Sequence, residues 1–350
     1  MTTPIVHLRD VKKRPGFLAL WEKRRNSKEV HWAIECFAEM LGVFLYVYFG
    51  VGSTAGFVIG NILSQPLSSL FQVGMAYAVG ILFALGVCAS TSGGHINPCI
   101  TVSLVVFKGF PKLKAVRYIT AQIIGAYIAS WVVYSQWKFL IVEAEETLKA
   151  QGVFEATQFT PNGPAGIFGL YLFPGQSLGR VFLNEWVNCT MIGLVLWAAL
   201  DPTTYFLPPA MGPWVVALTY AACIWGFAVP GISLNTARDV GGRLMAMSVW
   251  AAGGRYAAIA ALTNIPATLF AVFLYEFFLA DSDRVVTPPN LENMNVHANH
   301  RRLRQEQKAE RRSSRVQSLV DLGDKLSHEK PSISAFDHAP SGNVVERSNV

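Results

Sequence analysis

The sequence predicts an all-α membrane protein whose six transmembrane helices and two half-helices are arranged as inverted repeats. Three observations lead to this prediction. Hydrophobic residues form 52% of the 350-residue chain and charged residues only 15%, whereas soluble domains carry about 25% charged residues. Six apolar stretches are long enough to cross a bilayer. Two shorter apolar stretches, one in each half of the chain, begin at an Asn that follows a Gly-containing loop.

The six long stretches are expected to be transmembrane helices, because a bilayer-spanning helix needs about 20 mostly apolar residues. They cover roughly residues 32–52, 67–90, 116–137, 178–200, 209–229 and 256–280. The two shorter stretches, 97–107 and 235–251, are too short or too interrupted to span. With six spans, both termini lie on the same side of the membrane.

Basic residues are concentrated near the ends of the chain and in one connection. Residues 1–30 hold eight Lys or Arg, while the 138–177 segment is rich in Gly, Pro and acidic residues. Since Lys and Arg accumulate on the cytoplasmic side, we expect cytoplasmic termini and an external 138–177 segment. This defines a basic N-terminal tail (1–30), a channel-like membrane domain (31–280) and a largely disordered C-terminal tail (281–350). The plasma membrane is the default location.

The membrane domain repeats weakly, as residues 31–137 and 178–280. Each half carries one Glu at the start of its first apolar helix, Glu39 in "AEMLGVFLYVYFG" and Glu185 in "NEWVNCTMIGLVLW". Each half also has three spans, with a short broken helix after the second. Because three is odd, the two halves are inverted relative to each other. Inverted repeats with broken helices are a recurrent plan of membrane permeation proteins.

The two short stretches read as helices that start inside the membrane. The first N–H groups of a helix have no intrahelical partner, and lipid cannot supply one. Asn97 and Asn235 stand at the positions where a side-chain oxygen would accept such a bond, and Pro98 suits the first helical turn. In inverted halves the two caps meet near the midplane, where two Asn donors and two positive helix ends would face one lumen.

At these residues the chain resembles the major intrinsic proteins, the aquaporins and aquaglyceroporins. "SGGHINPC" and "GISLNTARDVGGRL" are similar to the two signature loops of that family, and the resemblance covers about residues 31–280. It implies an aquaporin-like fold and a tetramer with one pore per protomer. Both family motifs are Asn-Pro-Ala. Here Cys99 replaces the first Ala, Thr236 replaces the second Pro and Ala237 is kept, which leaves open the pore width at the midplane and the strictness of proton exclusion.

The same resemblance implies an outer selectivity filter. The family places an Arg three residues after the second Asn, here Arg238, and the corresponding neighbours are Tyr77, Cys223 and Ile232. Water-specific channels usually carry His at the position of Cys223, where it narrows the pore. A Cys leaves more room and a more apolar wall, against which the carbon chain of a polyol can lie.

Two charged residues after the filter Arg also favour glycerol. Asp239 directly follows Arg238, and Arg243 lies four residues further on, a pattern similar to that of the glycerol facilitators. Residues four apart on a helix are neighbours, so these two side chains are expected to pair and hold the loop open.

Three titratable residues in the membrane domain have a structural and a functional interpretation. Acids inside spans often serve proton or ion relays, but Glu39 and Glu185 are expected to accept hydrogen bonds from the backbone of the half-helix loops. His95, two residues before Asn97, could gate the pore by titrating. A fixed lumen or packing role is the favoured interpretation of this His.

These observations predict a passive channel for water and small neutral solutes such as glycerol, with the lipid bilayer and identical subunits as partners. No cofactor, metal, catalytic residue or nucleic acid is expected. Within the same class, the alternatives are a strict water channel or a channel for ammonia, urea or peroxide. A coupled secondary transporter would share the repeats but need titratable pairs at the midplane, and a non-conducting scaffold would show no permeability.

Overall fold

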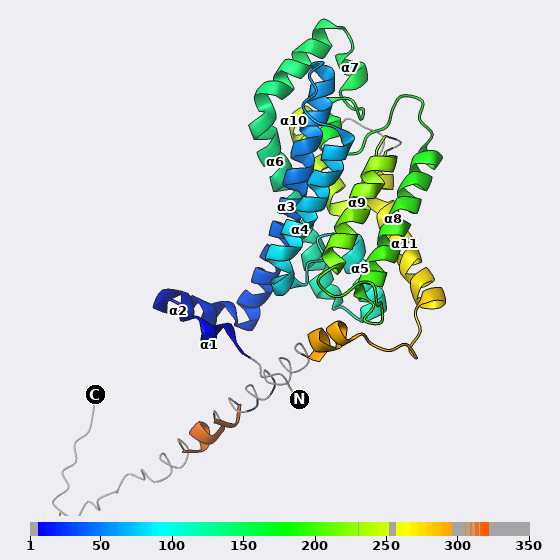
Figure 1. The fold of residues 1–350 in the computed structure, drawn as a ribbon. Helices are drawn as coiled ribbons and strands as arrows, with labels where there is room; N and C mark the ends of the chain where they lie inside the picture. Colours follow the sequence, from blue (N-terminus) through cyan, green and yellow to red (C-terminus); the bar gives the residue numbers. More distant parts are fainter. Residues whose placement is uncertain are drawn as a thin grey trace, which may run out of the picture. The chain divides into compact units, whose positions relative to one another are not determined.

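The computed structural model in Figure 1 describes residues 6–229, 231–251 and 257–295, with 305, 309, 312–314 and 316–321. It divides into two units, Val6–Asn293 and a second unit of the two chain ends. Everything below concerns the first unit. Most of the predicted C-terminal tail, with its expected disorder, lies outside the described residues.

The first half of the membrane domain consists of four helices. They are α3 (Lys28–Ile62), α4 (Leu70–Ser92), α5 (Pro98–Lys108) and α6 (Lys112–Ala150), preceded by the short helices α1 (Leu8–Val11) and α2 (Gly16–Arg25). The predicted half-helix at 97–107 is therefore present as α5, between two long helices.

The second half repeats this order. It comprises α8 (Leu178–Leu200), α9 (Gly212–Phe227), α10 (Thr236–Trp250) and α11 (Ala257–Leu274), which continues into the π-helical turn η2 (Tyr275–Leu279). Between the halves lie α7 (Phe154–Thr157) and the 3₁₀ turn η1 (Pro164–Ile167). The described residues contain no strand, so the predicted all-α fold is confirmed.

Five helices of the described residues are long and apolar enough to cross a bilayer; the predicted 209–229 span is the exception. Its helix, α9, has only 16 residues, which at 1.5 Å per residue covers about 24 Å, against a hydrocarbon core of about 30 Å. Prolines explain the shortening. Pro208 and Pro209 precede the helix and Pro230 follows it, and the residue before a Pro disfavours helical backbone.

The third span is longer than predicted, because α6 continues to Ala150 through part of the segment expected to be an external loop. Residues 138–150 contain no Gly or Pro and are rich in Leu, Ala, Glu and Lys, the residues that favour helix. Ile141, Ala144 and Leu148 are buried along one face, at the spacing of an amphipathic helix. Tertiary packing thus extends the helix beyond the apolar stretch.

The two halves pack as equivalents around a shared core. In the first half α3 packs against α4 and α6, and in the second α8 packs against α9 and α11. Contacts of α4 with α9, and of α10 with α6, join the halves. Figure 1 shows the half-helices at different levels, with α5 low in the bundle and α10 high. This is the arrangement that inverted repeats require.

Close helix contacts depend on glycine where α6 crosses α3. A Cβ atom at Gly125 would lie 2.2 Å from the backbone oxygen of Met40. A backbone atom cannot move aside as a flexible side chain can, so any larger residue must push the helices apart. By contrast, a Cβ at Gly86 of α4 would meet nothing within 4 Å.

We therefore expect Gly125→Ala to destabilise the protein by about 1–3 kcal/mol, the usual cost of overpacking. The measurement is the thermal unfolding midpoint of purified protein in detergent. Gly86→Ala is the matched control, because it adds the same methyl group to open space and should not lower the midpoint. Equal midpoints for the two variants would contradict the close crossing of α3 and α6.

Candidate functional site

The two predicted half-helix starts are capped by their own Asn side chains. Asn97 Oδ1 accepts the backbone N–H of Cys99 at 3.2 Å. Asn235 Oδ1 accepts the N–H groups of Ala237 at 2.9 Å and Arg238 at 3.2 Å. Both Asn residues have extended backbone before the helix, as N-caps do. Each cap therefore satisfies N–H groups that would otherwise be unpaired inside the protein.

The caps also bond to the opposite half. Asn97 Nδ2 donates to the backbone oxygen of Leu234 at 3.0 Å, and Asn235 Nδ2 donates to that of Ile96 at 2.9 Å. Ile96 and Leu234 precede the two Asn residues and both have positive φ, 44° and 60°. Such backbone is costly for branched or bulky residues. It persists here because the reciprocal bonds tie the two loops together, and the two half-helices therefore meet end to end.

Glu39 fixes the loop that precedes α5. Its carboxylate is fully buried. It accepts hydrogen bonds from the N–H of His95 at 2.9 Å, the N–H of Ile96 at 2.8 Å, the Ser92 hydroxyl at 2.7 Å and Gln122 Nε2 at 2.7 Å. Four donors compensate the loss of water that burial of a carboxylate entails. The expected contacts with the loop backbone are present.

Glu185 holds the second loop in the same way. Its carboxylate accepts the N–H groups of Ser233 at 2.7 Å and Leu234 at 2.8 Å, and Asn264 Nδ2 at 2.5 Å. The Asn264 oxygen accepts from the Thr236 hydroxyl at 3.2 Å. Asn264 thus corresponds to Gln122 of the first half. The Thr236 hydroxyl thereby links the start of α10, through Asn264, to the donors around Glu185. We call Glu185 and these donors the Glu185 cradle.

The departures from the family motif fit the cap region without disturbing it. Cys99 is buried, and its N–H donates to Asn97. Pro98 occupies the first helical position of α5, where the missing N–H costs nothing. Thr236 starts α10, and Ala237 is fully buried behind it. Neither replacement prevents a half-helix.

His95 is a packed residue. Its ring lies 4.7 Å from the ring of Phe110 and 5.2 Å from that of Tyr118, measured between centroids. Its Nδ1 lies 3.2 Å from the Thr101 hydroxyl. With 5% exposure, the ring is fixed by two aromatic neighbours and by the bond of Nδ1 to Thr101, which supports the packing interpretation over gating.

Three of the four predicted filter residues line one cavity of about 200 Å³. They are Tyr77 of α4, Ile232 of the second loop and Arg238 of α10. Cys223 is buried and does not line this cavity, whereas its neighbour Ile224 does. The place of Cys223 in the filter stays a prediction. Tyr46 of α3, which the sequence reasoning missed, forms part of the wall.

Arg238 is held by uncharged acceptors. Its Nε donates to the Tyr77 hydroxyl at 3.1 Å, and its two Nη atoms donate to the backbone oxygens of Phe168 at 3.1 Å and Ile167 at 3.2 Å. Among the described residues, no carboxylate pairs with it. A guanidinium has five N–H donors, so two remain after these three bonds. The site therefore carries an unneutralised positive charge with two spare donors.

Asp239 and Arg243 pair with each other, as expected, and also fix the outer loop. The carboxylate of Asp239 lies 3.3 Å from Arg243 Nη2 and accepts the N–H of Leu170 at 2.7 Å. Arg243 donates to the backbone oxygen of Leu170, and its guanidinium lies 4.7 Å from the ring centroid of Tyr171. Burial raises the pKa of the Tyr171 phenol, so the ring stays neutral. Asp239 is thereby neutralised by Arg243 and not by Arg238.

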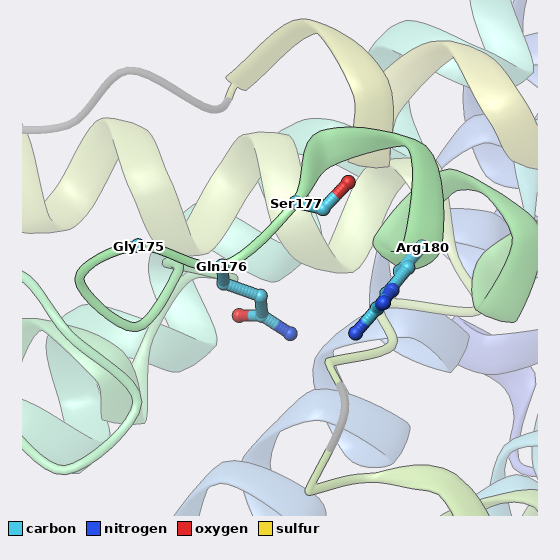
Figure 2. A pocket seen from close by; sticks show the side chains of 4 residues that line it. All are labelled: Gly175, Gln176, Ser177 and Arg180. Atoms are coloured by element: carbon cyan, nitrogen blue, oxygen red, sulfur yellow. The ribbon is translucent and has the colours of Figure 1, made fainter.

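A second pocket lies at the start of α8. It has a volume of about 430 Å³ and is lined by Gly175, Gln176, Ser177 and Arg180. Figure 2 shows the side chains of Gln176 and Arg180 directed toward the same space. None of the predicted site residues lines it.

The comparisons with known proteins agree with this geometry. The sequence model of "Major intrinsic protein" matches residues 26–260. The chain belongs to the major intrinsic protein family. It is 64% identical to "Aquaporin-3" of Laccaria bicolor, over 94% of this chain and 99% of that protein. It is 32% identical to "Aquaglyceroporin-2" of Rhizophagus irregularis, over 76% of this chain and 82% of that protein.

A solved structure of the family has the same fold. The aquaglyceroporin from Plasmodium falciparum superposes with a TM-score of 0.59, covering 71% of this chain and 97% of that one, at 20% sequence identity. As a major intrinsic protein with several membrane-spanning helices, the chain is an integral membrane protein.

Besides Tyr46, sequence reasoning missed two further site residues of this major intrinsic protein. Asn264 was visible only as part of "Asn-Ile-Pro" in the last span, with no assigned role. An amide inside a span needs a partner, and that signal was available. Tyr220, whose hydroxyl accepts from Asn97 Nδ2 at 3.0 Å, looked like any aromatic residue of an apolar helix. Nothing in the sequence distinguishes it.

Replacing Asn264 should weaken the Glu185 cradle. In Asn264→Leu, Glu185 loses its shortest hydrogen bond, and a buried acceptor without its partner costs about 1–3 kcal/mol. We expect a lower thermal midpoint in detergent. Leu262→Ala, at a side chain that is 64% exposed on the same helix, is the control and should change the midpoint much less. An unaltered midpoint in Asn264→Leu would show that the cradle does not depend on this amide.

Proposed function

We propose that this chain is a passive channel for water and small neutral solutes, with glycerol among them. The observation that carries the proposal is the end-to-end meeting of two half-helices, joined through Asn97 and Asn235, beneath a cavity walled by Arg238 and Tyr77. Relatives named aquaporin and aquaglyceroporin support it. An enzyme is not proposed, because members of this family are channels.

Passage needs only an exchange of hydrogen bonds. A water or polyol molecule leaves bulk solvent and accepts hydrogen bonds from the spare Arg238 donors. It then continues along backbone carbonyls past Asn97 and Asn235, which we call the Asn pair. Among the described residues, Asn235 gives one of its two amide hydrogens to Ile96, which leaves one for a permeating molecule. Fixed donors replace lost hydration without reorganisation, so the path conducts neutral polar molecules at low cost.

Charge exclusion follows from the same groups. The positive ends of α5 and α10 meet at the Asn pair, and each is equivalent to roughly half a positive charge. Because Asp239 is paired with Arg243, the charge of Arg238 is left to repel cations. Both barriers act on protons and metal ions and leave neutral solutes unaffected.

Glycerol, in preference to water alone, is supported by the walls of the outer cavity. Ile232, Ile224 and Tyr77 give apolar surface in the same cavity as the Arg238 donors, a combination that suits a molecule with a carbon chain and hydroxyl groups. The Asp239–Arg243 pair fixes the loop at Leu170 and keeps that side of the mouth in place.

The assembly and orientation are part of the proposal. We assign both termini to the cytoplasm because the N-terminal region is basic, and we propose a homotetramer in the plasma membrane with one pore per chain. Both half-helices join within a single chain, through Asn97 and Asn235, so each subunit would hold its own pore.

The test is stopped-flow light scattering of proteoliposomes that contain the purified full-length protein. Fast shrinkage in an impermeant sugar, followed by fast re-swelling in a glycerol gradient, is the expected result. Shrinkage without re-swelling would leave a strict water channel, and urea, ammonia and peroxide gradients would extend the comparison. Saturable flux that follows a pH gradient would indicate a coupled transporter. No flux at all would favour a scaffold and overturn the proposal.

Removing the outer charge should admit cations. At an assumed distance of ~6 Å and an effective dielectric constant of ~20, one unit charge contributes about 3 kcal/mol, so Arg238→Val is expected to raise proton or cation leak roughly 100-fold. The readout is pH-dye or conductance measurement in the same vesicles. Leak equal to that of the unmodified protein would count against Arg238 as the barrier.

A bulkier residue at position 223 should restrict polyols selectively. We expect Cys223→His to reduce glycerol flux several-fold more than water flux, since His is larger and would narrow the filter. The two fluxes are compared in one vesicle preparation. Equal loss of both would mean misfolding or that position 223 lies outside the filter, and Ile224→His would then test its cavity-lining neighbour.

A further inference from the structure

The two Asn side chains at the midplane are not equivalent. A side-chain amide has two N–H donors. Those of Asn97 are both engaged, one by the Leu234 backbone oxygen and one by the Tyr220 hydroxyl, each at 3.0 Å. Asn235 makes only the bond to Ile96 from its amide nitrogen within the described part of the chain. The first Asn therefore has no amide hydrogen left for a permeating molecule.

Tyr220 reaches this position from the middle of α9 and is 4% exposed. Its ring packs edge-on against Tyr46, with centroids 6.2 Å apart, and Tyr46 lies 5.3 Å from Tyr77. Tyr46 and Tyr77 both line the outer cavity. Three tyrosines therefore form a continuous aromatic column from the outer cavity to the Asn pair, and Tyr220 is its inner member.

We propose that Tyr220 is a specificity-determining residue of the channel, which replaces the Asn97 amide as the midplane hydrogen-bonding group on its side of the path. The proposal rests on the channel function proposed above. The phenolic oxygen accepts the Asn97 N–H, and its own O–H is left to donate. A hydroxyl both donates and accepts, whereas an amide N–H only donates. The added oxygen also takes up space next to the Asn pair.

Selectivity follows from these two properties. Water, which is small, passes beside the phenolic oxygen and exchanges hydrogen bonds with it. A larger solute meets the same oxygen as a steric restriction at the point where the two half-helices already approach. The midplane thus adds a size limit to the one set by Tyr77, Ile232 and Arg238 at the outer cavity.

Tyr220→Phe isolates the hydroxyl, because the ring and its packing on Tyr46 are kept. The variant releases the Asn97 N–H and removes one oxygen from the wall. We expect the ratio of glycerol to water permeability to rise about threefold, equivalent to about 0.65 kcal/mol in relative barrier height. Over the series urea, glycerol and erythritol, the gain should increase with solute size. A change in stability alone would leave these ratios unaltered.

Tyr275→Phe is the matched control. Tyr275 of η2 is also buried, and its hydroxyl donates to Asp201 Oδ2 at 2.8 Å, so the same atom and one hydrogen bond are lost at a residue outside the half-helix loops and the outer cavity. Its permeability ratios should equal those of the unmodified protein. Permeability is measured per reconstituted channel in stopped-flow vesicles, with folded protein quantified by size-exclusion chromatography.

The outcomes separate this inference from the proposed function. If the unmodified protein conducts and Tyr220→Phe leaves the solute ratios unchanged or lowers them, the role of Tyr220 is wrong and the channel function stands. If the unmodified protein conducts neither water nor glycerol, the proposed function itself fails. If Tyr220→Phe does not fold, Tyr220→Met, which keeps an apolar side chain without the hydroxyl, must raise the same ratios for the inference to stand.

Discussion

A helix that starts in the middle of a membrane has several backbone N–H groups with no acceptor in lipid, and the architecture around the Asn pair answers this constraint. Each loop before a half-helix is held by a buried carboxylate, Glu39 or Glu185, and each cap oxygen accepts from its own helix. The amide nitrogens then cross to the opposite loop. Each Asn amide thus finds its acceptor in the other half of the chain. The hydrogen bonding around the two caps therefore requires both halves of the inverted repeat.

The charged residues of α10 have different roles. Three charged residues lie within six positions of α10, and all are buried. Asp239 and Arg243 pair with each other and fix the outer loop, while the Arg238 side chain donates to two carbonyl oxygens and a phenol. The charges of Asp239 and Arg243 therefore serve to position the loop, while the charge of Arg238 acts on permeating molecules.

The sequence predicted elements whose cause is local, and it missed those whose cause is tertiary. The half-helix starts follow from Asn97 and Asn235, and family membership confirms the all-α fold. The extension of α6 depends on packing of residues such as Ile141, which hydropathy does not report. Asn264 and Tyr220 act through partners 79 and 123 residues away. A single sequence does not reveal pairings over such separations without a repeat to suggest them.

The extra length of α6 changes which forces stabilise one part of the core. Its 39 residues reach about 58 Å, well beyond a hydrocarbon layer of about 30 Å. Ile141 and Ala144, beyond the predicted span, share a buried cluster with Ile167 and Phe168. Residues 138–150 lie beyond the apolar stretch, where water and not lipid is the alternative to burial, and helices gain from the hydrophobic effect in water but little in lipid. Such stabilisation weakens on cooling, so we expect the packing of this end of α6 against the loop that carries the Arg238 acceptors to weaken in the cold.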